Sequence, residues 1–121
     1  MRNDKDNIIV KKTSDFALQI IDYSEKLKSV KKYEMTSQLF RSGLSVGANS
    51  WEAKNAESTT DFIHKFKIAA KEADETRYKI ELCKTSRHYP DSPETLFSEL
   101  KSISLIVSKI IGASKRNTLS N

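Results

Sequence analysis

The side chains that most often carry enzyme chemistry are few in this chain, and they are not grouped. Of its 121 residues, two are histidine and one is cysteine. His64 falls in a helical segment and His88 in a loop, with no Glu-x-x-His spacing and no second cysteine to complete a metal site. Cys83 lies on an apolar seam, which favours a small buried side chain over a nucleophile. We therefore expect no enzyme active site, no metal and no cofactor.

Two carboxylates could hold a cation or share a proton, because Glu72 and Glu75 lie three residues apart on one helix face. Basic residues are expected next to them, however, at Arg41, Lys65 and Lys79. We therefore interpret both carboxylates as structural partners in ion pairs rather than as catalytic groups.

The basic residues point to another chemistry, the binding of phosphate. The net charge of +5 permits a nucleic-acid partner without requiring one. If helix directions alternate, the ends of the first and third helices share one pole, which we name the basic pole and which comprises Lys26, Lys28, Lys31, Lys32, Lys84, Arg87 and His88. The opposite turn carries Glu57 and Asp61. Contacts from this pole to RNA or DNA would be directed at the backbone, whereas the alternative is that these side chains only solvate the bundle.

Four amphipathic helical segments must position these residues. Apolar or small side chains recur at alternating spacings of four and three, the period of one helix face. The four seams are Phe16, Ile20, Tyr23 and Leu27; Met35, Leu39, Ser42, Val46, Asn49, Ala53 and Ala56; Phe62, Phe66, Ala69, Ala73, Thr76, Ile80 and Cys83; and Leu96, Leu100, Ile103, Val107 and Ile110. The predicted fold is all-α, an up-down-up-down antiparallel four-helix bundle.

The predicted bundle spans residues 13–112, with Thr13 or Ser14 capping its first helix. Residues 1–12 are expected to form a flexible N-terminal arm, whose apolar patch at 8–10 rests on its own bundle or on a neighbour. Residues 113–121 are expected to be a polar C-terminal tail. No apolar run approaches the roughly 20 residues needed to span a bilayer, and the N-terminus does not resemble a signal peptide. These features predict a cytoplasmic protein without a membrane partner.

The second and third helices are predicted to pair in a single antiparallel register, in which Ser42 meets Thr76. A polar stripe behind each seam then brings opposite charges together. The predicted cross-helix pairs, which would fix the register, are Arg41 with Glu75 and Glu52 with Lys65. Glycine inside a helix costs about 1 kcal/mol relative to alanine, so Gly43 and Gly47 are expected to admit another backbone at close range. That backbone belongs either to the same chain or to a neighbouring subunit.

One stretch of the second helix resembles a known family. The run Gln38-Leu39-Phe40-Arg41-Ser42-Gly43-Leu44-Ser45-Val46-Gly47-Ala48-Asn49, followed by Glu52-Ala53 and Ala56, is similar to the signature of the 23S rRNA intervening sequence proteins. The run Asp61-Phe62-Ile63 and the later Lys71-Glu72-Ala73 resemble the third helix of that family. Trp51 and Lys79 depart from its pattern: Trp51 suggests an outer or interface face, and Lys79 puts an aromatic contact there in doubt.

The resemblance covers roughly residues 7–110 and implies a small bundle that assembles into a ring of about five subunits. One branch of the family comprises accessory proteins of diversity-generating retroelements, which work beside a reverse transcriptase and bind nucleic acid through basic surfaces. For most members no activity is established, so the resemblance settles fold better than function. We expect a non-enzymatic, oligomeric nucleic-acid-binding protein. The alternative is a protein-interaction scaffold or accessory subunit for a reverse transcriptase or another element-encoded partner.

Overall fold

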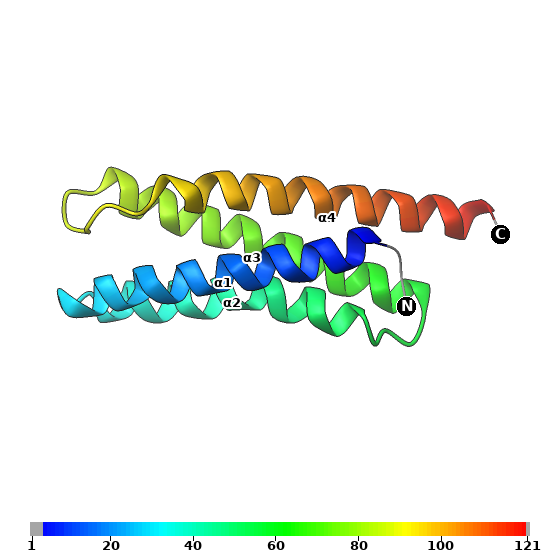
Figure 1. Cartoon of the computed structure of the whole chain (residues 1–121), viewed down its shortest axis with the longest axis horizontal. Helices are drawn as coiled ribbons and strands as arrows, with labels where there is room; N and C mark the ends of the chain where they lie inside the picture. Colours follow the sequence, from blue (N-terminus) through cyan, green and yellow to red (C-terminus); the bar gives the residue numbers. More distant parts are fainter. Residues whose placement is uncertain (1–3, 121) are drawn as a thin grey trace.

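The structure, a computed structural model, describes residues 4–120 and the side chains of residues 7–117. Four helices make up this part of the chain, namely α1 (Asp4–Ser29), α2 (Tyr33–Ala53), α3 (Thr59–Thr85) and α4 (Glu94–Ser120). They run antiparallel in sequence order, so that α1 and α3 end at the same end of the molecule (Figure 1). The predicted up-down-up-down bundle is confirmed. None of the helices in residues 4–120 is long and apolar enough to cross a membrane.

Each helix packs against two others, because α1 and α3 both contact α2 and α4. The predicted seams meet along the axis of the bundle. Its largest fully buried side chains are Phe16, Phe66, Ile9, Ile20, Leu27, Leu39, Ile80, Leu96, Leu100, Ile103, Val46 and Val107. At about 25 cal/mol per Å² of apolar surface removed from water, this core is the main stabilising contribution.

The two helical glycines of α2 let α1 approach closely. A Cβ atom at Gly43 would lie 2.9 Å from both γ carbons of Ile20, and one at Gly47 would lie 3.3 Å from Cβ and Oγ1 of Thr13. Of the two sources that the sequence left open, the close backbone is therefore one from the same chain.

The register of α2 against α3 is the predicted one. Thr76 Oγ1 lies 2.9 Å from Ser42 Oγ and 2.7 Å from the carbonyl oxygen of Glu72, and all of Thr76 is buried. Because a hydroxyl has one proton and a carbonyl oxygen can only accept, Thr76 donates to the Glu72 carbonyl and accepts a hydrogen bond from the Ser42 hydroxyl. The turn before α3 is closed by Ser58, whose side chain accepts a hydrogen bond from the Asp61 backbone N–H.

The expected N-terminal arm is wrong for residues 4–12, which are part of α1. Ile9 lies seven residues before Phe16, continues the buried seam and is fully buried. Thr13 does not cap the helix; it is buried inside it, and its hydroxyl lies 2.8 Å from the Ile9 carbonyl oxygen. Residues 1–3 lie outside the described part of the chain.

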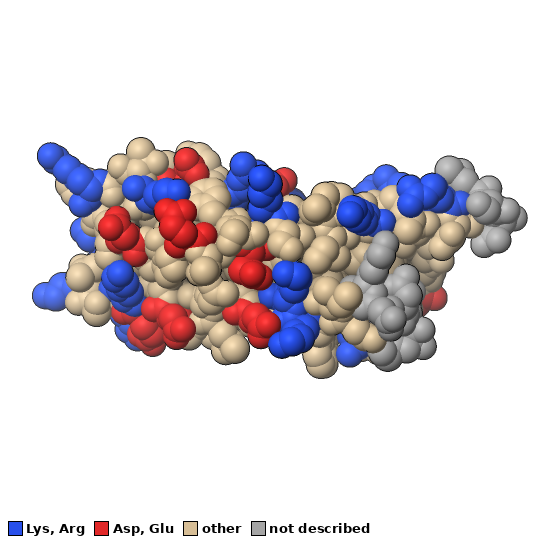
Figure 2. Space-filling model, turned by 45° about the horizontal axis from the view of Figure 1, so that its top comes forward, with Lys and Arg blue, Asp and Glu red and all other residues tan. Residues whose placement is uncertain are grey.

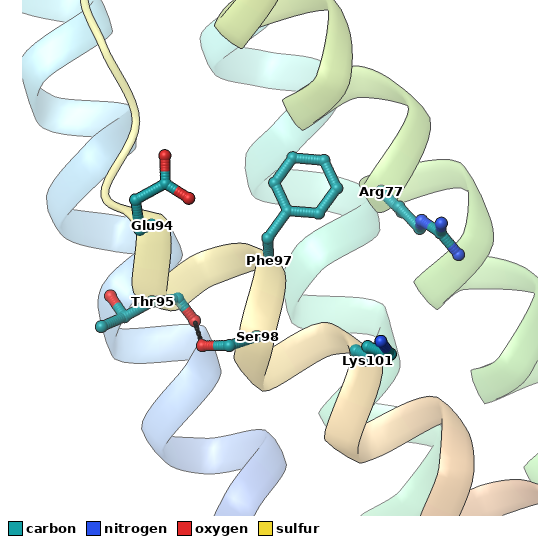
Figure 3. A pocket seen from close by; sticks show the side chains of 6 residues that line it. All are labelled: Arg77, Glu94, Thr95, Phe97, Ser98 and Lys101. Carbon is teal, nitrogen blue, oxygen red and sulfur yellow. Dashed lines mark hydrogen bonds between the residues drawn. The ribbon is translucent and has the colours of Figure 1, made fainter.

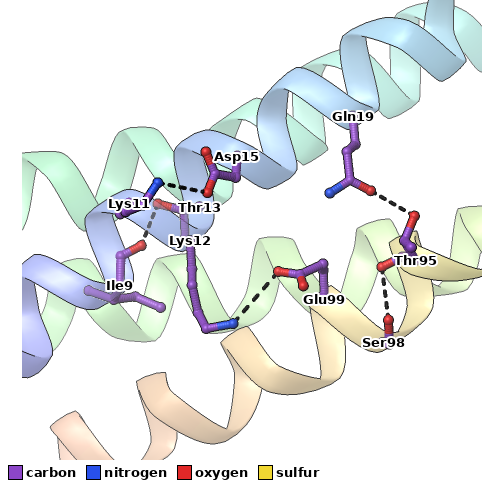
Figure 4. A network of polar contacts seen from close by, with 9 residues as sticks. All are labelled: Ile9, Lys11, Lys12, Thr13, Asp15, Gln19, Thr95, Ser98 and Glu99. Atoms are coloured by element: carbon purple, nitrogen blue, oxygen red, sulfur yellow. Dashed lines mark hydrogen bonds and ion pairs between the residues drawn. The ribbon is translucent and has the colours of Figure 1, made fainter.

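Polar contacts also tie α1 to its neighbour α4 (Figure 4). Lys12 Nζ lies 3.8 Å from a carboxylate oxygen of Glu99, and Thr95 Oγ1 lies 2.9 Å from the side-chain oxygen of Gln19. Both contacts are between helices that are distant in sequence, so they fix the position of α4 along α1.

The expected C-terminal tail is also wrong for residues 113–120, which continue α4. Gly112 does not end this helix, and residue 113 remains partly buried. Residue 121 lies outside the described part. At the same end of the molecule, α2 ends at Ala53, three residues before the last position of its predicted seam, Ala56. The chain turns there, with the Ala56 N–H donating to the Ala53 carbonyl.

Candidate nucleic-acid interface

The fold brings the predicted basic pole together at one end of the bundle. α1 contributes Lys26 and Lys28 from its last turn, the α1–α2 connection contributes Lys31 and Lys32, and the end of α3 contributes Lys84. The α3–α4 connection adds Arg87 and His88. Figure 2 shows Lys and Arg side chains projecting from this end of the molecule.

Two of these cations, Lys84 and Lys26, are already engaged by the chain itself, and a third, Lys32, makes only a weak contact. Lys84 Nζ forms an ion pair with Glu94 at 3.3 Å and lies 5.0 Å from the Phe97 ring centroid. Lys26 donates a hydrogen bond to the Asp91 carbonyl, and Lys32 Nζ lies 6.0 Å from the ring centroid of Tyr89.

The remaining cations of the basic pole are Lys28, Lys31 and Arg87. All three are exposed, and none makes an ion pair with any residue of the described part. His88 is exposed too, and its backbone N–H donates to Ser86 Oγ. These are the side chains of the pole that are free to meet phosphate.

The basic pole carries more negative charge than its lysines suggested. Residues 25–36 and 81–95, which surround the pole, contain six Lys or Arg and five Asp or Glu. Such a balance gives a weak long-range field, so attraction to a polyanion depends on the individual unpaired cations.

A second basic surface lies on α4, and the sequence reasoning missed it. From residue 100 onward the chain has four basic residues and no acidic one, namely Lys101, Lys109, Lys115 and Arg116. In Figure 2, Lys and Arg side chains follow the edge of the molecule along this helix. The available signal was the absence of Asp and Glu after Glu99. It was overlooked because residues 113–121 were expected to be a tail rather than the last turns of a helix.

A hollow of about 380 Å³ lies between α3 and α4 and is lined by Arg77, Glu94, Thr95, Phe97, Ser98 and Lys101 (Figure 3). The Phe97 ring rises from α4 between the two helices, while Arg77 extends from α3 on the far side. Neither Arg77 nor Lys101 has an ion-pair partner among the described residues. The hollow therefore offers two free cations beside an apolar ring.

A second hollow, of about 340 Å³, lies at the basic pole. It is lined by Lys31, Lys32, Tyr33, Glu34, Met35 and Tyr89, so the start of α2 and the α3–α4 connection form it together. The backbone at Lys31 has a φ angle of 66°, in the left-handed region that a non-glycine residue seldom adopts. This conformation turns the chain sharply from α1 into α2.

One of the two predicted polar pairs is confirmed and the other is wrong. Lys65 Nζ lies 3.2 Å from Glu52 Oε1, as expected. Arg41, however, pairs with Glu72 at 3.9 Å and not with Glu75. A spacing of seven residues places Lys65, Glu72 and Lys79 in one line along α3, and this line faces α2. Glu75 lies outside this line, farther around the helix from α2.

The buried ionisable groups are held in their neutral forms. Burial raises the pKa of the Cys83 thiol, which is fully buried as predicted. Burial also raises the pKa of Tyr23 above its ordinary value, and its hydroxyl donates to the Pro90 carbonyl at 2.6 Å. This bond anchors the α3–α4 connection to α1. The described residues contain no group of His, Cys, Asp and Glu that could hold a metal ion.

Comparison with known proteins places the chain in a family. A solved structure from Bacteroides thetaiotaomicron, described as a protein with unknown function from the S23 ribosomal protein family, is 36% identical. The alignment covers 89% of this chain and 98% of that one, with a TM-score of 0.80. A search of curated proteins gave no match.

The family comparison covers nearly the whole bundle. Residues 5–112 match the family described as 23S rRNA-intervening sequence protein. The match begins in the first turn of α1 and ends at Gly112, so it includes all the seams and the second-helix signature. The chain therefore belongs to the 23S rRNA-intervening sequence protein family.

Proposed function

We propose that this protein binds nucleic acid without catalysing a reaction, through the basic pole and the adjoining surface between α3 and α4. The observation that carries the proposal is a set of exposed cations without intramolecular ion pairs in the described part of the chain. They are Lys28, Lys31 and Arg87 at the pole, and Arg77 and Lys101 beside the α3–α4 hollow. A free cation can bind phosphate without first breaking a contact within the protein.

Binding of this kind is driven by release of counterions from the nucleic acid. Each phosphate that a cation neutralises contributes about −0.9 to the slope of log K against log salt for duplex DNA, and about −0.7 for a single strand. Five cations give a slope of about −4.5 or −3.5 per subunit if all five are engaged. The contacts are directed at the backbone, so we propose weak sequence preference.

We further propose that several copies of the chain assemble, as the ring of about five subunits implied by the resemblance would require. The support is an apolar stripe on α2 made by Phe40, Leu44 and Trp51 at spacings of four and seven, in which Leu44 is half-buried against the core and Phe40 and Trp51 are exposed. Phe40 is 44% exposed and Trp51 is 55% exposed. Tryptophan and phenylalanine bury large apolar areas at interfaces. A ring would repeat the free cations and raise the avidity for a long polyanion.

The same α2 stripe favours a second candidate function, a scaffold or accessory subunit that binds a reverse transcriptase or another element-encoded protein. In that case a different protein covers Phe40 and Trp51. Light scattering on the purified protein distinguishes a second copy of this chain from a different protein as the partner that covers Phe40 and Trp51, because assembly of this chain alone supports self-association. Trp51→Glu should then give monomers, while a monomeric wild-type protein would favour a foreign partner.

The test of nucleic-acid binding is fluorescence anisotropy with labelled RNA and DNA at several salt concentrations. One variant reverses the charge of the cations at the basic pole (Lys28→Glu, Lys31→Glu, Arg87→Glu). Another reverses the charge of the cations beside the α3–α4 hollow (Arg77→Glu, Lys101→Glu). We expect both to weaken binding and to flatten the salt dependence, by an amount that follows the number of cations removed.

A matched control reverses two lysines near the start of α1, Lys11→Glu and Lys12→Glu, and changes the net charge as much as the variant at the α3–α4 hollow does. Both residues already have partners, since Lys11 pairs with Asp15 at 3.3 Å and Lys12 pairs with Glu99 at 3.8 Å. An equal loss of affinity in the control and in the variant at the α3–α4 hollow would mean that binding depends only on the net charge of the protein. Absence of binding to both polymers at low salt would rule out the proposed function.

A further inference from the structure

We infer that the hollow at the basic pole receives one unpaired base of a single-stranded nucleic acid, with the base stacked on Tyr33 and with Tyr89 forming a second wall of the hollow. This inference rests on the proposed function and makes it more specific, because it selects single strands over duplexes. Two aromatic rings and two lysines line the same hollow. Rings bind the flat faces of bases, and lysines bind the phosphates that join them.

Tyr33 is the more accessible of the two rings. Its side chain is 59% exposed although it is aromatic, and it stands at the first position of α2. Most of the apolar surface of this ring is still in contact with water in the folded protein. A base that stacks on the ring can therefore bury that surface. Within the described residues its hydroxyl makes no hydrogen bond, so no internal contact must break.

Tyr89 supplies a second surface from a different element. Its ring is half-buried and packs against the core, which fixes its position. Lys32 Nζ lies 6.0 Å from its centroid, at the outer limit of a cation–π contact. Such a weak contact leaves the ring available to a base while it keeps the ammonium nearby for phosphate.

The size and charge of the hollow agree with one nucleotide. Its volume of about 340 Å³ lies at the small end of the range of ligand sites, roughly 300–1,000 Å³. Lys31 and Lys32 stand on its wall, and Glu34 also lines it. Because the Glu34 carboxylate repels phosphate, the backbone of the strand should pass on the side of the two lysines. The bases of a duplex are stacked inside the helix, so only an unpaired base can enter.

The experiment compares a single-stranded 12-mer with the duplex of the same sequence, by anisotropy, for wild type, Tyr33→Ala, Tyr33→Phe and Tyr78→Ala. Tyr78 is the matched control, because it is a tyrosine of similar exposure, 65%, on α3. Tyr33→Ala should weaken single-strand binding by about 5- to 150-fold, the usual effect of removing a base-stacking ring. Tyr33→Phe keeps the ring and should bind like wild type, as should Tyr78→Ala, and duplex binding should not change.

A 12-mer with one 2-aminopurine in place of adenine gives an independent signal, since stacking on an aromatic ring quenches its fluorescence. The quenching should disappear in Tyr33→Ala and persist in Tyr33→Phe. If Tyr33→Ala binds the single strand as Tyr78→Ala does, the inference is overturned while salt-dependent binding to the cations still stands. If the wild-type protein binds neither polymer, the proposed function fails and the inference fails with it.

Discussion

Replacing Gly43 with alanine should destabilise the bundle, although alanine is the better helix former. The substitution removes a propensity penalty of about 1 kcal/mol. It also places a Cβ atom 2.9 Å from both γ carbons of Ile20, far closer than carbon atoms normally approach. Ile20 is fully buried and β-branched, so its χ1 angle has one strongly preferred setting in a helix and the two γ carbons have nowhere to move.

The net effect is the difference between these two contributions. Overpacking a core costs about 1–3 kcal/mol, so Gly43→Ala should lower the free energy of unfolding by about 1 kcal/mol after the gain in propensity. For a domain of this size that corresponds to a fall in Tm of about 3–5 °C. Gly112→Ala is the matched control, because the nearest atom to its added Cβ is the end of the flexible Arg116 side chain, at 3.3 Å. It should stabilise the protein by up to about 1 kcal/mol.

A double-mutant cycle with Ile20 tests the cause. Ile20→Val keeps both γ carbons, so Gly43→Ala should be as harmful in that background as in wild type. Ile20→Ala removes both, and there Gly43→Ala should become neutral or stabilising. Urea unfolding followed by circular dichroism measures each free energy. A Gly43→Ala protein that is more stable than wild type, or equal losses in the Ile20→Val and Ile20→Ala backgrounds, would refute the reasoning.

Three further predictions follow from contacts of the bundle. Ile9→Ala should cost about 2–5 kcal/mol in urea unfolding because Ile9 is a core side chain, whereas a loose arm would show no loss. Arg41→Ala and Glu72→Ala should couple by no more than about 1 kcal/mol in a double-mutant cycle, since Arg41 is 63% exposed, and strictly additive losses would exclude the pair. Stability should fall as the pH rises above about 8.5, the ordinary pKa of cysteine, and further above about 10, that of tyrosine, because folding raises the pKa of Cys83 and Tyr23 and the unfolded chain loses these protons first. Tyr23→Phe should remove the tyrosine part of the alkaline loss in pH-dependent Tm measurements.

The α2–α3 pairing was predictable because it depends on residue spacing alone. Ser42 and Thr76 fall on seams of the same period, and a single antiparallel register brings them within hydrogen-bonding distance. The same register brings Glu52 next to Lys65. Arg41 lies beside Ser42, where the register still holds, so spacing alone did not decide between Glu72 and Glu75; the long, 63% exposed side chain of Arg41 reaches Glu72 in the structure.

The ends of the bundle were less predictable. Residues 4–12 are mostly charged or polar, and the three apolar residues among them were too few to establish a helical period. Ile9 is buried because this part of α1 packs in the bundle, where α1 contacts α2 and α4. Such tertiary packing stabilises the first turns of the helix, and the local sequence does not reveal it. α4 likewise continues through residues 113–120, where residues 113 and 114 are partly buried and residues 115–117 are exposed.

The sequence alone determined the number of helices, their buried faces and their antiparallel order, because hydrophobic periodicity and short connections leave few other arrangements. It also determined which residues could meet phosphate at the basic pole. Only the tertiary structure decided which cations are free, since Lys84 and Lys26 find partners on the α3–α4 segment that no spacing rule places beside them. It alone formed the hollow of Tyr33 and Tyr89, which lie 56 positions apart in the sequence and meet because α2 begins where α3 has ended.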